Sequence, residues 1–359
     1  MIQYIQILRF AAAMWVALYH AKYSDFFPQL PQALRIFIDG GYAGVDIFFV
    51  ISGVIMALVT QDSPRGIRHA GQFVLMRFAR IYTGWWPVMA ITVGMFVWLN
   101  ALLPQTNLWS SAFLYFSNSS LHVSSVIWTL MYELYFYLII GLSLLLPVGW
   151  RDRILGVMAL CIAVYVAAQW SAGNYQATEL HRATYTTWFF AAPLVLEFFA
   201  GYFLYRYLQK KPHHDWRWWA VATLILAMLA MYVGRKVIPA ESFLAEFYFW
   251  TERTIFVGLA ACALLGTALL APPLPQGRWQ WLSSLGNYSF AIYLLHSLVF
   301  DIFRRSATWL EPLYQHRVAV TCLVFVVLLA FSALYYHFIE HPLYQACRRK
   351  ITQWLPLKT

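Results

Sequence analysis

Ten long apolar runs follow one another along this chain, and they limit the folds that it can adopt. A helix needs about 20 apolar residues to cross the hydrocarbon layer of a bilayer. The connecting segments are short, so we expect residues 1–359 to form one all-α integral membrane domain with about ten transmembrane helices in one bundle. The predicted spans are 4–22, 41–60, 81–103, 124–147, 153–170, 184–206, 217–234, 252–271, 282–302 and 318–339.

The composition excludes a large soluble domain. Only 11% of the residues are charged and 61% are hydrophobic, whereas a soluble domain has about 25% charged residues. The net charge of +10 comes from short loops, with no basic stripe interleaved with aromatic residues, so we expect no nucleic-acid partner. The four cysteines form no CxxC pair, and we expect neither a metal site nor a disulfide framework.

The loops predict the orientation of the bundle. Lys and Arg are more numerous in the loops on the side of the N terminus, and positive residues concentrate in cytoplasmic loops, so we expect both termini in the cytoplasm. The first run has neither a basic leader nor a small-residue cleavage site, and we expect a retained helix. The apolar run 107–116 is too short to span, and we expect a re-entrant or interfacial segment there.

The first predicted span carries two ionisable residues, Arg9 and His20. Eleven helical steps of about 100° bring both side chains to one face, about 16 Å apart along the axis. Charges inside a membrane are costly, so a functional role is one interpretation of this pair. The other is that Arg9 extends to the interface and His20 is an ordinary polar residue there. The spacing alone does not separate the two interpretations.

Asp46 lies near the outer end of the second span, at the expected depth of His20. A carboxylate beside a histidine fixes its tautomer and raises its basicity. We therefore expect Asp46 to orient His20 in a general-base dyad. The alternative is that Asp46 is only a residue of the helix start, where a negative charge is favourable.

Arg77 and Arg80 come directly before the third predicted span. Residues at i and i+3 share a helix face, and guanidinium forks suit phosphate groups. On the cytoplasmic rim the pair is expected to hold the anionic end of a cofactor. Plain anchoring of the helix by positive charge is an equally strong alternative.

Three further ionisable residues lie within predicted spans: Glu133, Glu197 and His296. A buried carboxylate is either paired with a cation or functional. Glu133 or Glu197 can neutralise Arg9, and for Glu197 we favour this structural role. Glu133 stays open between structure and function. His296 by itself is more typical of a packed polar residue than of a catalyst.

Several motifs resemble those of the membrane-bound acyltransferase family 3. They extend over nearly the whole chain in the family's order, so together they are highly specific. The motifs are Arg9-x10-His20, GVDIFFVISG at 44–53, RFARIY at 77–82, WTLMYE at 128–133, SLGNYSFAIYLLH at 284–296 and IEHP at 339–342. The form GVDIFFVISG is most similar to the branch that acetylates bacterial exopolysaccharides such as succinoglycan and xanthan.

The resemblance implies an enzyme of the bacterial inner membrane that transfers an acetyl group from acetyl-CoA to a saccharide or a lipid-linked oligosaccharide, without a metal. His20 then matches the family's essential histidine, and Arg9 matches its partner. Arg77 and Arg80 match the cytoplasmic Arg-x-x-Arg, and Glu133 matches the glutamate that follows the family's tryptophan. Membrane lipid and a polysaccharide assembly machinery are the other expected partners.

We assign Trp128, Tyr132 and His296 to binding of the acceptor. The chain departs from the family's pattern at Thr83, where Pro is usual, and at Thr129, where Ser is usual. These changes affect local helix geometry but remove none of the proposed chemical groups.

The predicted mechanism gives His20 the role of general base, with Arg9 near the cofactor or the developing oxyanion. An acetyl-histidine intermediate is the alternative route. The competing class is a proton-coupled transporter or a lipid or polysaccharide flippase, since such carriers also hold intramembrane Arg, His and Glu. The sequence contains no internal repeat and no matched pair of broken helices, which favours the enzyme.

Overall fold

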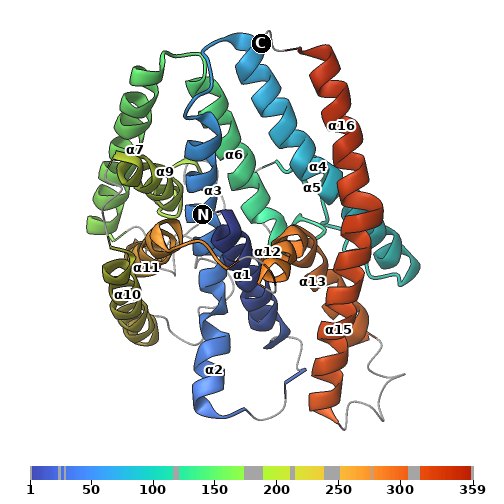
Figure 1. Cartoon of the computed structure of the whole chain (residues 1–359). Helices are drawn as coiled ribbons and strands as arrows, with labels where there is room; N and C mark the ends of the chain where they lie inside the picture. Colours follow the sequence, from blue (N-terminus) through green and yellow to red (C-terminus); the bar gives the residue numbers. More distant parts are fainter. Residues whose placement is uncertain are drawn as a thin grey trace.

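The computed structural model describes residues 2–22, 26–27, 30–115, 121–173, 189–210, 215–237, 251–275, 277, 279–305 and 316–356. All regular secondary structure in this part of the chain is helical (Figure 1). The longer helices are α1 (Ile2–Lys22), α3 (Ala43–Thr60), α4 (Ile67–Trp98), α6 (Trp128–Ser143), α7 (Val148–Ser171), α9 (Val195–Lys210), α10 (Trp216–Val237), α11 (Thr251–Leu270), α13 (Ser289–Arg305), α15 (Arg317–Tyr335) and α16 (His341–Trp354). The short elements are α2 (Gln32–Asp39), α5 (Leu108–Phe113), α12 (Gln280–Leu285) and the single turns η1 (Gly40–Tyr42), η3 (Ser125–Ile127), η6 (Gly286–Tyr288) and η7 (Tyr336–Glu340).

Every predicted span overlaps one of these helices, so the all-α architecture is confirmed. The predicted span 184–206 begins in residues 184–188, which lie outside the described residues. Within the described chain, seven helical segments are long and apolar enough to cross a membrane. The chain is therefore a multi-pass membrane protein, while the number of ten crossings stays a prediction.

Two helices are longer than the hydropathy pattern predicted. α4 begins at Ile67, directly after Gly66, whose φ of 143° is a conformation that L side chains rarely adopt. Arg77 and Arg80 therefore lie within a continuous helix rather than ahead of it. At the other end of the chain, α15 continues through the π-helical turn η7 into α16. Charged residues end the apolar signal in both places, although the backbone stays helical.

Within the run 107–116, which was expected to be a re-entrant or interfacial segment, Leu108–Phe113 form the short helix α5, and residue 116 lies outside the described residues. Asn107 caps its start by accepting the Ser110 N–H through Oδ1 at 2.9 Å. The Trp85 indole N–H of α4 donates to the Ser111 carbonyl at 2.7 Å. The segment is therefore held directly against α4.

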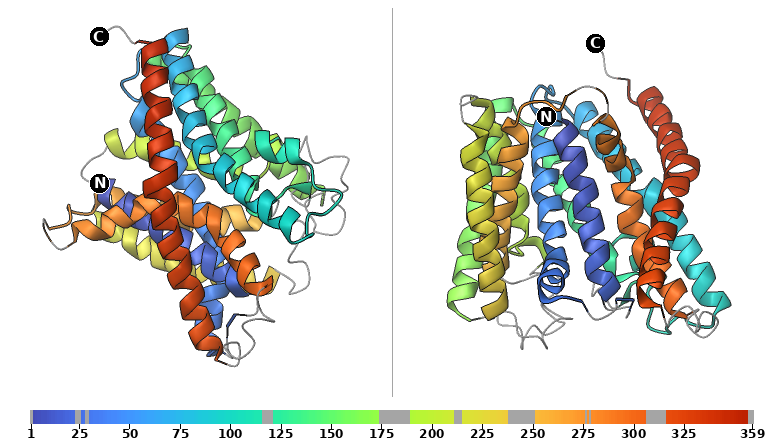
Figure 2. Two further views of the ribbon diagram at one scale, coloured as in Figure 1. Left: turned by 90° about the vertical axis from the view of Figure 1, so that its right-hand side faces the viewer. Right: turned by 60° about the horizontal axis from the view of Figure 1, so that its bottom comes forward.

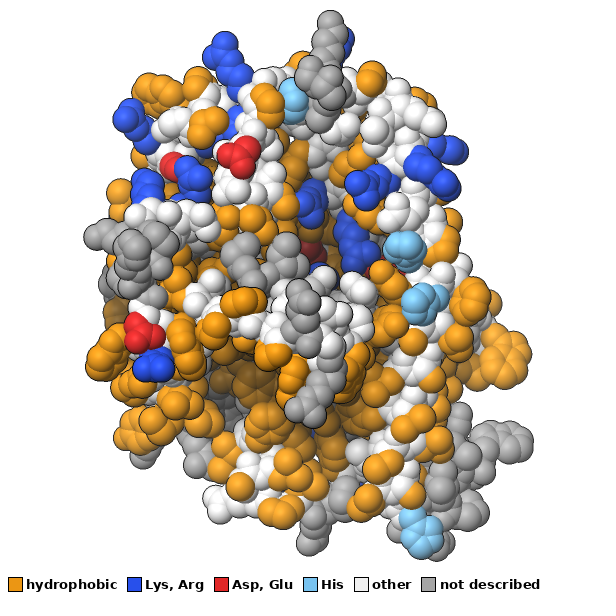
Figure 3. Space-filling view, in the orientation of Figure 1, with side chains coloured by type: hydrophobic (Ala, Val, Ile, Leu, Met, Phe, Trp, Pro, Cys, Tyr) orange, Lys and Arg blue, Asp and Glu red, His pale blue; other side chains and the backbone are white. Residues whose placement is uncertain are grey.

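The two chain termini lie at the same end of the bundle (Figure 2, right). We call this end, which includes the start of α1, the start of α4 and the end of α16, the terminal end. In the space-filling view, Lys and Arg side chains gather in the upper half, and the lower half is largely hydrophobic (Figure 3). Basic and acidic atoms are also visible in a hollow near the middle of this face.

α3 packs against two helices in direct backbone contact. A Cβ added to Gly53 would lie 2.0 Å from the Phe198 carbonyl oxygen of α9, and Gly201 of α9 makes a similar contact in return. A Cβ added to Gly44 would lie 2.6 Å from the Ala12 carbonyl oxygen of α1. Small residues allow membrane helices to approach this closely. These crossings bring the polar residues of α1, α3 and α9 into the interior of the bundle.

Candidate active site

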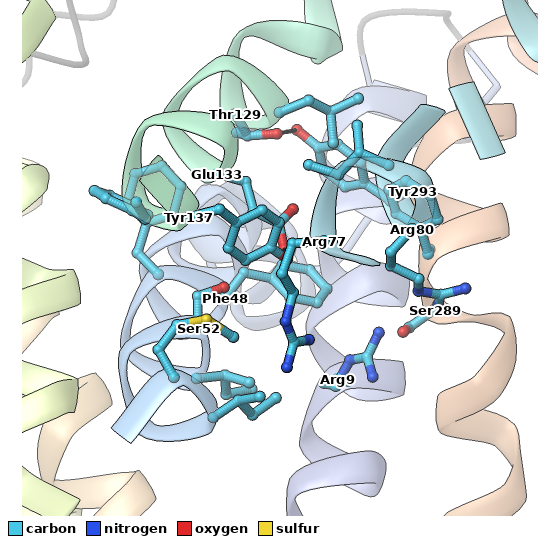
Figure 4. Close-up of a pocket in the computed structure, with 18 of the residues that line it drawn as sticks. Arg9, Phe48, Ser52, Arg77, Arg80, Thr129, Glu133, Tyr137, Ser289 and Tyr293 are labelled. Atoms are coloured by element: carbon cyan, nitrogen blue, oxygen red, sulfur yellow. Dashed lines mark hydrogen bonds between the residues drawn. The ribbon is translucent and has the colours of Figure 1, made fainter. Parts of the chain in front are cut away.

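A cavity of about 930 Å³, its opening included, lies among α1, α3, α4, α6 and α13. We call it the central cavity. α1 packs against α3 and α13, which turns its polar face toward this interior. Apolar and aromatic side chains form much of the wall (Figure 4). The polar lining residues are Arg9, Ser52, Arg77, Arg80, Thr129, Glu133, Tyr137, Ser289 and Tyr293.

Three guanidinium groups lie around the same part of the central cavity (Figure 4). Arg9 comes from α1, and Arg77 and Arg80 lie nearly one turn apart on α4. Arg9 donates from Nη1 to Gln6 Oε1 at 3.2 Å. Three cations around one space attract an anionic ligand, and low-dielectric walls strengthen that attraction.

The two arginines of α4 have different surroundings. Arg80 forms an ion pair with Glu340 of η7, whose carboxyl is fully buried, and its guanidinium lies 5.3 Å from the centre of the Phe290 ring. The Arg77 guanidinium lies 5.4 Å from the Phe73 ring and has no carboxylate partner among the described residues. Arg77 is therefore the member of the predicted phosphate clamp with a guanidinium available to a ligand. Arg80 ties α4 to the C-terminal helices.

Glu133 lies in the central cavity with the arginines, as Figure 4 shows. Its Oε1 accepts the Tyr137 hydroxyl, and it forms no ion pair within the described residues. Glu133 is close enough to Arg9 for their charges to interact. Glu133 thus forms no direct salt bridge with Arg9, and Glu340 is a second carboxylate whose charge interacts with this guanidinium.

His20 of α1 meets His296 of α13. His20 Nδ1 lies 3.1 Å from His296 Nε2, and the two rings stack at 24° with centroids 4.9 Å apart. The other nitrogen of His296, Nδ1, lies 3.3 Å from the Ile292 carbonyl oxygen. His296 is fully buried and His20 is half-buried.

These contacts assign the tautomers of both neutral rings. A carbonyl oxygen only accepts, so His296 Nδ1 carries a hydrogen and donates it to Ile292. His296 Nε2 is then an acceptor, and His20 Nδ1 must be the donor. The Val16 carbonyl, a second acceptor, also interacts with the His20 ring. His20 Nε2 therefore keeps its lone pair and is able to take up a proton.

The histidine pair lies one helical turn beyond the wall of the central cavity. Tyr293, which precedes His296 by three residues on α13, lines the cavity, and its ring centroid is 5.7 Å from that of His296. The Tyr293 hydroxyl donates to the Val126 carbonyl at 2.8 Å and accepts from Thr129 Oγ1 at 2.8 Å. His20 itself does not line the cavity. Tyr293 and Thr129 line the cavity on the side away from Arg9 (Figure 4).

Asp46 does not orient His20, contrary to the prediction. It accepts from Arg253 of α11 at both oxygens, with Nε at 3.0 Å from Oδ1 and Nη2 at 2.7 Å from Oδ2. Both side chains are buried. The sequence placed Asp46 at a suitable depth but did not show that its face of α3 turns toward α11. His296 takes the place that the prediction gave to the carboxylate.

Glu197 does not neutralise Arg9 either. It lies in the first turn of α9, where its charge interacts with Asp46 and Arg253. Its side chain lies against Gly258 of α11, whose lack of a side chain makes room for it. Glu197 belongs to a buried cluster of two acids and one arginine away from the central cavity.

Trp128 and Tyr132 are packed into the aromatic core instead of lining the central cavity. The Tyr132 ring stacks on Phe189 with centroids 4.2 Å apart, and Phe49 contacts both predicted residues. Both side chains are buried, and their role in acceptor binding stays a prediction. The residues that the sequence analysis missed are Tyr137, Tyr293, Arg253 and Glu340. Tyr137 follows Glu133 by one turn of α6, and Tyr293 and Glu340 lie within motifs at 284–296 and 339–342, so helical spacing and these motifs were the available signals. Arg253 has no such signal, because its role depends on its contact with Asp46 of α3.

The fold and the cavity define an integral membrane protein with an arginine-lined polar site buried among its helices. The sequence profile of the acyltransferase domain matches residues 2–337. The chain therefore belongs to the membrane-bound acyltransferase family 3, as its motifs predicted, and it is an acyltransferase by family.

Curated relatives extend this comparison. BcsY of Komagataeibacter xylinus, named as a membrane-bound transacylase, is 28% identical over 72% of this chain and 66% of its own length. The exopolysaccharide production protein ExoZ of Rhizobium meliloti is 33% identical over 45% of this chain and 49% of its own. The acyltransferase MdmB of Streptomyces mycarofaciens is 26% identical over 81% of this chain and 77% of its own. The matched part thus spans just under two-thirds of BcsY and about half of ExoZ. No solved structure matches the chain.

Proposed function

We propose that this acyltransferase moves an acetyl group from acetyl-CoA to a hydroxyl of a bacterial exopolysaccharide or of its lipid-linked repeat unit. The observation that carries the proposal is the His20–His296 contact near an arginine-lined cavity. That contact leaves His20 Nε2 free to accept the proton of an acceptor hydroxyl. The relative ExoZ is named for exopolysaccharide production, which supports a polysaccharide acceptor.

The transfer itself is a single displacement at the thioester. The acceptor oxygen attacks the thioester carbonyl carbon while its proton moves to His20 Nε2. The carbon–sulfur bond then breaks, and the leaving thiolate takes the proton from the imidazolium. The products are the O-acetyl sugar and the free thiol of CoA, and His20 returns to its neutral form.

The pantetheine arm of the donor is proposed to lie in the central cavity. Tyr293 and Thr129 line the cavity, and Tyr293 lies one turn from His296, so we place the thioester at that side, nearest to the histidine pair. Arg77 and Arg9 lie on the side of the anionic part of the donor, where their positive charge favours it. We place the terminal end in the cytoplasm of a bacterial inner membrane, because basic residues concentrate on the cytoplasmic side of membrane proteins.

Mass spectrometry of the host's polysaccharide tests this proposal. Removing the gene should abolish the acetyl groups, and re-expression of the wild-type chain should restore them. The His20→Ala variant, expressed to the same level in the membrane, should not restore them. Unchanged acetylation without the gene would contradict the proposed acceptor, and a loss of polysaccharide export with normal acetylation would favour a transporter.

A further inference from the structure

A second cavity, of about 990 Å³ with its mouth included, opens at the terminal end of the bundle. It lies between the first part of α4 and the middle of α16, which run side by side (Figures 1 and 2). The cationic or titratable nitrogen side chains that line it are His69, Arg77 and Arg348. None of the described lining residues is Asp or Glu. We call this space the entry pocket, and its charge suits an anionic ligand.

The entry pocket and the central cavity share one residue, Arg77. His69 lies eight residues before Arg77, which is about 12 Å along the axis of α4. The entry pocket and the central cavity therefore follow one another along α4, from the terminal end toward the interior. A ligand with a bulky anionic head and a thin arm matches this arrangement, with its head in the entry pocket and its arm passing Arg77.

Specific contacts hold α16 in the position that forms the entry pocket. Gln72 Nε2 of α4 donates to the Leu355 carbonyl at 3.0 Å. The ion pair of Arg80 with Glu340 fixes the start of α16, and the Arg80 guanidinium lies 5.7 Å from the centre of the Tyr344 ring. The family profile ends at residue 337, so α16 lies beyond the matched domain. α16 supplies one wall of this pocket.

We propose that the entry pocket binds the nucleotide end of the acyl donor, an adenosine that carries phosphate groups, and that Arg348 of α16 contacts those phosphates. The inference rests on the proposed function in one respect, the use of a CoA thioester. Guanidinium groups pair with phosphate oxygens through charge-assisted hydrogen bonds. In this arrangement Arg348 and His69 face the nucleotide. Arg77 lies between the entry pocket and the central cavity, and Phe73 forms part of the apolar wall of the entry pocket.

Equilibrium binding of CoA to the full-length protein in phosphatidylcholine nanodiscs tests this assignment. Arg348→Gln is compared with Arg349→Gln, since Arg349 is the adjacent exposed residue of the same charge and does not line the entry pocket. We expect Arg348→Gln to weaken CoA binding about tenfold through the loss of charge-assisted bonds. Arg349→Gln should change the affinity less than about twofold, as surface charges contribute little.

Two further measurements identify the ligand that Arg348 binds. His69→Gln should also weaken CoA binding, and pantetheine, which lacks the nucleotide, should bind equally to all variants. A wild-type protein that does not bind CoA would overturn the donor in the proposed function. Wild-type CoA affinity in Arg348→Gln would overturn the nucleotide site alone. If that variant loses only its affinity for phosphatidylglycerol added to the nanodiscs, the entry pocket serves a lipid headgroup and the inference is wrong.

Discussion

His20 Nδ1 lies 3.1 Å from His296 Nε2, although 276 residues separate the two histidines. Because His296 Nδ1 is committed to the Ile292 carbonyl, the direction of the hydrogen bond between the rings is determined. A neutral histidine therefore does for His20 what a carboxylate does in other general-base pairs: it holds the ring and selects the tautomer. It does so without adding a negative charge to the membrane interior.

Removing the acceptor on His296 should lower turnover without weakening donor binding. In His296→Phe the His20 Nδ1–H loses the His296 acceptor and keeps only the Val16 carbonyl, so His20 populates the unproductive tautomer as well. The loss of one neutral hydrogen bond, about 1 kcal/mol, corresponds to a fall in kcat of roughly fivefold or more. Steady-state kinetics should show this fall with an unchanged KM for acetyl-CoA. His296→Gln, which keeps an acceptor oxygen, should recover part of the rate, and equal losses in both variants would indicate a packing effect only.

The two arginines of α4 should differ when each is replaced. Arg77→Gln should raise the KM for acetyl-CoA about tenfold with a small effect on stability, because its guanidinium is available to the donor. Arg80→Gln should lower the melting temperature instead, since it leaves the buried Glu340 carboxylate unpaired. The double variant Arg80→Gln, Glu340→Gln should regain much of that stability. Identical kinetic effects of the two single variants would contradict this division.

Asp46 and Arg253 should behave as a structural pair. Asp46→Asn leaves a buried guanidinium without its carboxylate, and breaking such a pair costs about 3–5 kcal/mol. We expect a lower melting temperature in detergent and a smaller folded yield. The folded fraction should keep its kcat, because Asp46 does not contact His20. A folded Asp46→Asn protein with a kcat as low as that of His20→Ala would restore Asp46 to the catalytic group.

The crossing of α3 and α9 should not tolerate a methyl group. A Cβ at Gly53 would lie 2.0 Å from a backbone oxygen, so Gly53→Ala should destabilise the protein by roughly 1–3 kcal/mol. Gly94 of α4 is the matched control, because a Cβ there has no neighbouring atom within 4 Å. Gly94→Ala should be neutral or stabilising by up to about 1 kcal/mol, as expected for a helix interior. Thermal unfolding of the two variants side by side makes the comparison, and equal midpoints would contradict the close crossing.

The helices were predictable from the sequence because a membrane imposes a simple requirement. Backbone groups in lipid must be satisfied within each helix, so long apolar runs have almost no alternative structure. The hydropathy pattern gave the wrong helix ends where polar residues begin but the backbone stays helical. α4 starts at Ile67 and α16 continues to Trp354, although charged residues interrupt the apolar signal in both.

The partners of the polar residues were less predictable. Helical periodicity shows that Arg9 and His20 share a face of α1, but it does not show which helix covers that face. Asp46 and Arg253 are 207 residues apart, and Arg253 falls at the very start of its apolar run. Only the packing of α3 between α1, α9 and α11 decides that Asp46 meets Arg253 while His20 meets His296.

Turnover of the purified His20→Ala protein tests the central claim most directly. The assay supplies acetyl-CoA and the acceptor saccharide and compares the variant with the wild-type chain at matched folded protein. A general base contributes about 10²–10⁴-fold, so kcat should fall by that factor while CoA binding stays unchanged. Wild-type turnover in the variant would remove His20 from the mechanism.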